Sequence, residues 1–166
     1  MSGPAGQPLR LLPSYAGSKQ QWVHRLSHFQ GRNIVELFAG TAAISMNYAN
    51  KAMLVELDPY LAKIISRYDE LIVPEVFTRD DYYEVRGRED WWRYAYCLSI
   101  MAFSGLFRYS DKGFNATHKG GGAGKPGTSP AHERMHLQPE YQRNLDRWKA
   151  LRPDVRNVSY LDITFD

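Results

Sequence analysis

A short apolar segment that ends in a glycine turn is the first feature of this sequence that could do chemistry. Residues 33–38 have the composition of a strand, and the turn that follows is Phe38-Ala39-Gly40-Thr41-Ala42. Open α/β sheets bind small molecules beyond the carboxyl ends of their strands, where glycine lets the backbone approach the ligand. The full G-x-G-x-x-G fingerprint is absent, so the turn predicts a small-molecule site without identifying its ligand.

An acidic residue stands near the end of a second apolar segment. Residues 52–57 also have the composition of a strand, and Glu56 lies next to its last position. In nucleoside-binding folds, an Asp or Glu at this place accepts hydrogen bonds from ribose hydroxyls. The turn and Glu56 together indicate a nucleoside-type ligand, and a strand-turn-helix without a ligand is the alternative.

A segment rich in basic and aromatic residues covers residues 91–134. It holds six Lys or Arg against two Asp or Glu, whereas residues 75–90 hold three against six. Basic groups among aromatic rings can bind phosphates and stack or wedge against bases. The alternative is a solvated surface over an aromatic core.

Three other patterns carry no chemistry. The glycine run 120–125 has Lys119 and Pro126 where a phosphate-binding loop needs Gly and Ser or Thr, so we interpret it as a flexible loop. The single cysteine, Cys97, lies in an apolar helical segment, which favours a buried thiol over a nucleophile. The five histidines have no metal-ligand spacing, and we expect no metal site.

The elements that must position these residues have the order β-α-β-α. The sequence predicts a helix over 42–50 and another from Pro59 to about Leu71, because Asp58 suits a helix cap and proline the first turn. Neither strand alternates cleanly, which is typical of parallel strands covered on both faces. An α/β layered fold follows.

The rest of the chain is predicted to form an insertion, followed by a segment that returns to the sheet. We expect a core over residues 1–74, an insertion over 75–150 and a return segment over 151–166. The insertion has helices predicted at about 90–105 and 138–150, and a loop over 117–131 that holds most of its glycines. Residues 155–162 predict a third strand.

The length and charge of the chain indicate its size class, its compartment and its possible partners. The 166 residues fit one domain with a sizeable insertion. No stretch approaches the roughly 20 apolar residues of a membrane span, and the single cysteine suits a reducing compartment, so we expect a soluble, cytoplasmic protein with no membrane partner. The net charge of +3 is too small to establish a nucleic-acid partner by itself.

Four motifs, in order, resemble those of the amino-terminal part of DNA adenine-N6 methyltransferases of the Dam type, the D12 class. The resemblance extends from Leu9 to Asp166. Residues 15–19 resemble the family's aromatic-x-Gly-Gly-Lys motif, and residues 36–42 its Pro-Phe-x-Gly-x-Gly cofactor turn. Residues 55–61 resemble its acidic cofactor motif. Residues 103–109 with 113–115 resemble its Tyr-Asn-Gly-Leu-x-Arg-Tyr to Phe-Asn stretch, which lies in the target-recognition insertion.

The resemblance implies a partial Rossmann-like core of about three parallel strands, with an inserted, mainly helical target-recognition region. It implies S-adenosylmethionine as cofactor and double-stranded DNA as partner, for adenine-specific methylation in a restriction-modification or phage setting. By this analogy, the cofactor-binding residues are Tyr15, Lys19, Phe38, Ala39, Gly40, Thr41, Ala42, Glu56, Leu57, Asp162 and Ile163. The DNA-binding residues are Phe103, Ser104, Arg108, Tyr109, Lys112, Asn115, Lys119 and Lys125.

Individual roles follow from the same analogy. Glu56 would bind the cofactor's ribose, Phe38 to Ala42 would wrap its methionine end, and Asp162 with Ile163 would lie near its adenine. Arg108 would contact a guanine edge or a phosphate, for which its bidentate geometry is suited. Phe103 would wedge or stack against bases, and its alternative role is in a core cluster at a helix end.

The sequence also departs from the family pattern. Ala42 and Ser18 replace glycines, and Ser104 replaces an asparagine. The family's Asp-Pro-Pro-Tyr, which holds the flipped adenine, occurs nowhere, so the catalytic residues are unknown. The sheet would lack the neighbour of its first strand, and residues 34–38 would form an open apolar edge. Such an edge invites a complementing chain with the catalytic half, or self-association.

Three readings compete. The first is a DNA adenine-N6 methyltransferase that is truncated or split. The second is a non-catalytic module that binds DNA, S-adenosylmethionine or both, as a decoy or regulator. The third, a protein-interaction domain, leaves the cofactor motifs unexplained. We expect the first.

Overall fold

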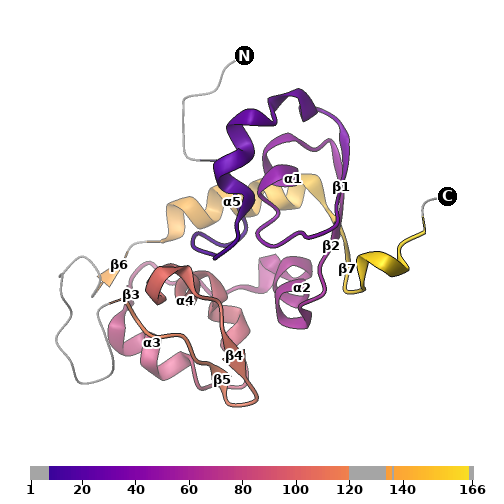
Figure 1. Cartoon of the computed structure of the whole chain (residues 1–166). Coiled ribbons are helices and arrows are strands. Elements are labelled where there is room, and N and C mark those ends of the chain that lie inside the picture. The colour runs from indigo at the N-terminus through magenta and orange to yellow at the C-terminus, as the bar shows by residue number, and fades with distance from the viewer. Residues whose placement is uncertain (1–7, 120–133, 136, 165–166) are drawn as a thin grey trace.

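A three-stranded parallel sheet organises the chain. The computed structural model describes residues 8–119, 134–135 and 137–164. Its strands β1 (Asn33–Glu36), β2 (Lys51–Val55) and β7 (Asp154–Arg156) pair in the order β1-β2-β7 (Figure 1). Val35 lies opposite Met53, and Leu54 lies opposite Val155. The α/β fold with about three parallel strands is therefore confirmed, and β1 is an edge strand within the described residues.

Both sheet connections place their helices on one face. Helix α1 (Ala43–Tyr48) joins β1 to β2, and α2 (Pro59–Ser66) begins the path from β2 to β7. The chain moves across the sheet in one direction, and right-handed crossovers then place both helices on the same side. Figure 1 shows α1, α2 and the long α5 (Gln138–Leu151) together on that side.

The opposite face of the sheet is partly exposed among the described residues. Ile34, Leu54 and Val155 pack into the main core, and Ala52 is buried with them. Because side chains alternate along a strand, Val35 and Met53 point the other way, and Val35 is 43% exposed. Val55 lies on the same side as Val35 but is only 1% exposed, so this second face is covered in part, while helices α1, α2 and α5 lie on the first face.

The insertion folds against the α2 end of the core. It contains β3 (Phe77–Thr78), α3 (Arg79–Val85), η4 (Trp91–Tyr94), α4 (Ala95–Met101) and η5 (Phe103–Gly105), where η denotes a 3₁₀ helix. A hairpin of β4 (Tyr109–Ser110) and β5 (Gly113–Phe114) follows, and β6 (Arg134–Met135) pairs with β3. The buried aromatic rings of this region belong to the same core cluster as the sheet, so the insertion and the sheet share one core.

Side-chain caps explain where several elements begin. Asp58 Oδ1 accepts a hydrogen bond from the Leu61 amide at 2.8 Å and so starts α2 as predicted. Thr78 and Asp81 form a reciprocal capping box at the start of α3. The remaining 3₁₀ helices are η1 (Lys19–Arg25), η2 (Ser27–Phe29), η3 (Tyr68–Glu70) and η7 (Tyr160–Asp162).

Three predicted elements need correction. The helix expected to about Leu71 ends at Ser66 and is followed by η3. The helix expected over 90–105 is three pieces, because the backbone becomes extended at Ala102 and left-handed at Ser104. The strand expected over 155–162 is only Asp154–Arg156, and residues 160–162 form η7 instead.

Candidate functional site

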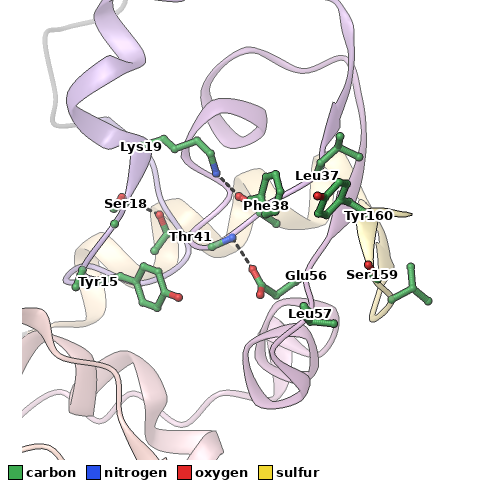
Figure 2. A pocket seen from close by; sticks show the side chains of 15 residues that line it. Tyr15, Ser18, Lys19, Leu37, Phe38, Thr41, Glu56, Leu57, Ser159 and Tyr160 are labelled. Carbon is green, nitrogen blue, oxygen red and sulfur yellow. Dashed lines mark hydrogen bonds between the residues drawn. The ribbon is translucent and has the colours of Figure 1, made fainter. Parts of the chain in front are cut away.

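A pocket of about 420 Å³ lies at the carboxyl ends of the parallel strands. Its lining comes from four separate segments, residues 15–19, 37–41, 56–57 and 158–160 (Figure 2). The volume falls in the range of roughly 300–1,000 Å³ that is usual for small-molecule sites. We refer to it as the carboxyl-end pocket.

The glycine turn forms the floor between the strands and α1. Gly40 has φ +53° and Ala42 φ +50°, so two residues of the turn are left-handed. Ala42 is therefore an L-residue in a conformation that glycine adopts more easily, which costs about 1–2 kcal/mol. The Ala39 amide donates to the Val55 carbonyl at 3.0 Å, which fixes the turn against β2.

Glu56 connects the turn to the start of α2. Its Oε2 accepts a hydrogen bond from the Gly40 amide at 2.9 Å (Figure 2). Its Oε1 accepts one from the Asp58 amide at 3.0 Å. A carboxylate offers about four lone-pair positions. Glu56 can therefore hold the backbone of the turn and still accept hydrogen bonds from a ligand.

The segment 15–19 closes the pocket from the amino-terminal side. Ser18 Oγ and Thr41 Oγ1 are 2.9 Å apart and share a hydrogen bond. Lys19 Nζ donates to the Phe38 carbonyl oxygen. The side chains of Ser18 and Lys19 thus bind the glycine turn, and Figure 2 shows both contacts at the pocket.

Residues after β7 form the remaining wall. Asn157 Nδ2 donates to the carbonyl oxygens of Glu56 at 2.7 Å and Leu57 at 3.0 Å, which ties this segment to the end of β2. The Tyr160 ring lies 5.0 Å from the Phe38 ring, centroid to centroid, and Phe38 is 62% exposed. Exposed aromatic rings at a pocket mouth offer flat surfaces for a planar ligand group.

Most of the predicted cofactor residues lie together at this pocket. Tyr15, Lys19, Phe38, Glu56 and Leu57 line it, as do three residues of the turn, Ala39, Gly40 and Thr41. Ala42 is fully buried behind the turn.

The two remaining cofactor predictions lie elsewhere. The strand that was to carry Asp162 and Ile163 to the pocket ends at Arg156, and neither residue is part of the lining. Residues 158–160 line the pocket in their place, and the sequence analysis missed them together with Ala16, Gly17, Ser18 and Leu37. Of these, residues 16–18 and Leu37 lie within motif segments that could have indicated them, whereas residues 158–160 carry no such signal.

The pocket holds both a neutral phenol and charged groups. Burial raises the pKa of Tyr15, and the nearby carboxylates of Glu56 and Asp58 raise it further. Tyr15 therefore stays a hydrogen-bond donor at neutral pH. With Lys19 on one wall and Glu56 on another, the site suits a ligand that carries both an anionic group and hydroxyl donors.

The residues predicted to contact DNA divide into an exposed group and a packed group. Phe103 is 59% exposed, and Ser104, Arg108 and Lys112 are exposed as well. Arg108 Nε donates to Asn115 Oδ1 at 2.7 Å, so the half-buried Asn115 orients the guanidinium. Phe103 is not in a core cluster, contrary to its alternative role.

Tyr109, Lys119 and Lys125 differ from that exposed group. Tyr109 packs edge-on against Tyr60 of α2, at a ring distance of 4.6 Å, and burial raises its pKa. Lys119 is half-buried, and desolvation lowers its pKa, with a further lowering from Arg10. Lys125 lies outside the described residues.

Cys97 lies outside the carboxyl-end pocket. Cys97 is buried, and desolvation raises its pKa to about 12, which confirms an inert thiol. Within the described ranges, no group of three His, Cys, Asp or Glu could hold a metal ion. The helices described are all too short or too polar to cross a membrane.

No protein-family profile matches the chain, and no curated protein matches it either.

Proposed function

We propose that this chain is the amino-terminal part of an S-adenosylmethionine-dependent DNA adenine-N6 methyltransferase with a Rossmann-like core. One observation carries the proposal. Three motif segments that resemble the family, residues 15–19, 37–41 and 56–57, line one pocket at the carboxyl ends of parallel strands. This is where open α/β sheets hold nucleoside cofactors.

The donors and acceptors of the carboxyl-end pocket fit S-adenosylmethionine. Glu56 has acceptor positions left for ribose hydroxyls after its two backbone bonds. Lys19 and the turn offer positive charge and backbone polar groups to the methionine end. Phe38, Leu57 and Tyr160 offer exposed apolar surface to the adenine. When bound, the cofactor supplies a methyl group activated by its sulfonium.

Calorimetric titration with S-adenosylmethionine tests the proposal. Glu56→Gln should weaken binding about 10- to 100-fold, because a hydrogen bond to a charged group contributes about 1.5–3 kcal/mol. Gln keeps the shape and one of the two oxygens that accept the Gly40 and Asp58 amides, and circular dichroism verifies that the variant is folded. Glu75→Gln, an exposed change outside the pocket lining, is the matched control. No binding by the folded wild type would refute the proposal.

The insertion is the part that we propose to contact duplex DNA. The exposed Phe103 and the oriented Arg108 lie five positions apart, on η5 and immediately before β4. Arg in this setting can bind a guanine edge or a phosphate, and an exposed ring can wedge between bases. The exposed Lys112 adds phosphate affinity.

A complementing polypeptide belongs to the proposal. Methyl transfer to an exocyclic amine needs an extruded base and an acceptor for the charge that develops on its nitrogen. The Asp-Pro-Pro-Tyr that supplies this acceptor in the family does not occur in the sequence. Within the described residues β1 has no partner on its outer side and Val35 is exposed, which leaves room for the missing catalytic half, cut away or carried by another chain, to complete the sheet.

The second candidate is a non-catalytic module that binds DNA, the cofactor or both. The absence of Asp-Pro-Pro-Tyr favours it, since the pocket and the exposed insertion residues could bind ligands without turnover. Salt-dependent binding of duplex DNA that is weakened by Arg108→Ala, without methyl transfer under any complementation, would distinguish it.

A further inference from the structure

A buried carboxylate lies directly behind the carboxyl-end pocket. Glu36, the last residue of β1, is only 5% exposed. Its Oε2 accepts hydrogen bonds from the Ser45 amide at 3.1 Å and from Ser45 Oγ at 2.7 Å. Its Oε1 is buried and accepts no hydrogen bond from the described residues. Half of this carboxylate is thus available for another interaction.

The group that Oε1 faces is the ammonium of Lys19. The two atoms are 3.5 Å apart, which makes an ion pair without a hydrogen bond. Lys19 is 37% exposed and also donates to the Phe38 carbonyl oxygen. Lys19 belongs to the 15–19 wall of the pocket, whereas Glu36 directly precedes the 37–41 wall. The ion pair therefore joins two pocket walls that are 17 positions apart in sequence.

We propose that Glu36 is a positioning residue of the pocket, which acts through Lys19 to hold the 15–19 wall against the glycine turn. We call this Lys19–Glu36 ion pair the clamp. The identity of the ligand rests on the proposed function, but the clamp itself is a property of the free protein. Glu36 does not line the pocket, and it would shape ligand binding without touching the ligand.

Stability does not account for a carboxylate at this place. Desolvation raises the pKa of Glu36, and the opposing contributions of Ser45 and Lys19 are smaller. Buried ion pairs often cost more in desolvation than they return, and an isosteric neutral residue is then tolerated. The position of the 15–19 wall depends on this ion pair, which explains why a carboxylate that does not stabilise the fold faces Lys19.

Hydrogen exchange of the free protein tests the clamp. The amides of Ala16 and Ser18 are reporters, because they donate to the carbonyls of Gly105 and Tyr15 at 3.1 Å each. Glu36→Gln should speed their exchange about tenfold, the factor that corresponds to about 1.4 kcal/mol. Ser45→Ala is the matched control, since it removes one bond to Glu36 and none to Lys19; exchange should stay near the wild-type rate.

A double mutant distinguishes an effect of Glu36 that acts through Lys19 from a general loosening of the fold. In a Lys19→Met background, Glu36→Gln should add no further increase in exchange at residues 15–19, because the interaction is already gone. If the two changes add independently, or if Glu36→Gln alone leaves exchange unchanged in a folded protein, the proposal is wrong.

The ligand titration gives an independent result. Glu36→Gln should weaken S-adenosylmethionine binding, and this effect should also vanish in the Lys19→Met background. A faster exchange in Glu36→Gln together with no binding by the wild type would refute the proposed function and leave the clamp intact. Normal exchange together with wild-type binding would refute the clamp alone.

Discussion

At the scale of single residues, burial of Glu36 predicts a specific pH dependence of stability. Desolvation raises its pKa above the ordinary value of 4.5, so the folded protein binds the proton more tightly than the unfolded chain. The stabilisation from this proton is complete below the unfolded pKa and is lost as pH rises through the folded pKa. A tenfold difference in proton affinity between the two states corresponds to about 1.4 kcal/mol of stability.

The comparison with Glu36→Gln isolates this effect. Other titrating groups cancel in the difference between the two proteins, and Gln cannot titrate. We expect the stability of the variant, relative to the wild type, to increase from about pH 4 towards pH 7, as measured by urea unfolding at each pH. A difference that stays flat or falls with pH would mean that Lys19 and Ser45 outweigh the desolvation of the carboxylate.

At the scale of elements, the contact between η5 and the 15–19 wall depends on Gly105. Its φ is +65°, and a Cβ there would lie 2.3 Å from Ser14 Oγ and 3.2 Å from the Tyr15 amide nitrogen. The Gly105 carbonyl also accepts the Ala16 amide at 3.1 Å. We expect Gly105→Ala to cost about 2–4 kcal/mol in urea unfolding, from left-handed strain and overpacking together.

Gly87→Ala provides the matched control. A Cβ at Gly87 meets nothing within 4 Å, and its backbone is not left-handed. The substitution should therefore be close to neutral or slightly stabilising. If the two alanine variants were equally stable, the docking of η5 on the amino-terminal segment would be looser than the geometry indicates.

Elements with local signals could be predicted from the sequence, and those that depend on distant partners could not. The first two strands and the start of α2 follow from apolar runs and from the cap at Asp58. The return strand was predicted too long because Asn157 leaves the sheet to bind carbonyls about 100 positions away. The end of α4 at Ala102 was missed although Gly105 lies close after it, because the bond between the Gly105 carbonyl and the Ala16 amide exists only in the folded chain.

The candidate site, too, could be predicted only where local motifs mark it. Motif segments supplied the residues from 15–19, 37–41 and 56–57, because their spacing is part of the sequence. The wall at 158–160 and the pairing of Glu36 with Lys19 exist only after the chain folds. A buried acid at a strand end gives no sign in the sequence of which cation it will face.

At the scale of the whole molecule, the sheet predicts how the proposed activity could be completed. Both crossovers cover one face, and β1 has an unpaired side within the described residues. Parallel sheets are normally covered on both faces. We expect methyl transfer to duplex DNA when the chain is mixed with the carboxyl-terminal half of a Dam-type enzyme that carries Asp-Pro-Pro-Tyr, measured with a radiolabelled methyl donor.

A charge on the partly exposed face should block this complementation. Val35→Lys places an ammonium on an exposed position that a completing chain would cover, and it should leave the isolated chain folded, since exposed substitutions usually change stability by less than about 0.5 kcal/mol. Ala150→Lys, an exposed position on α5, should not interfere. Because burying an unpaired charge costs several kcal/mol, we expect the Val35 variant to lose most of the restored transfer. Equal methyl transfer with both lysine variants would mean that the completing chain does not cover Val35. If no catalytic half restores transfer while DNA binding is intact, the non-catalytic module is favoured.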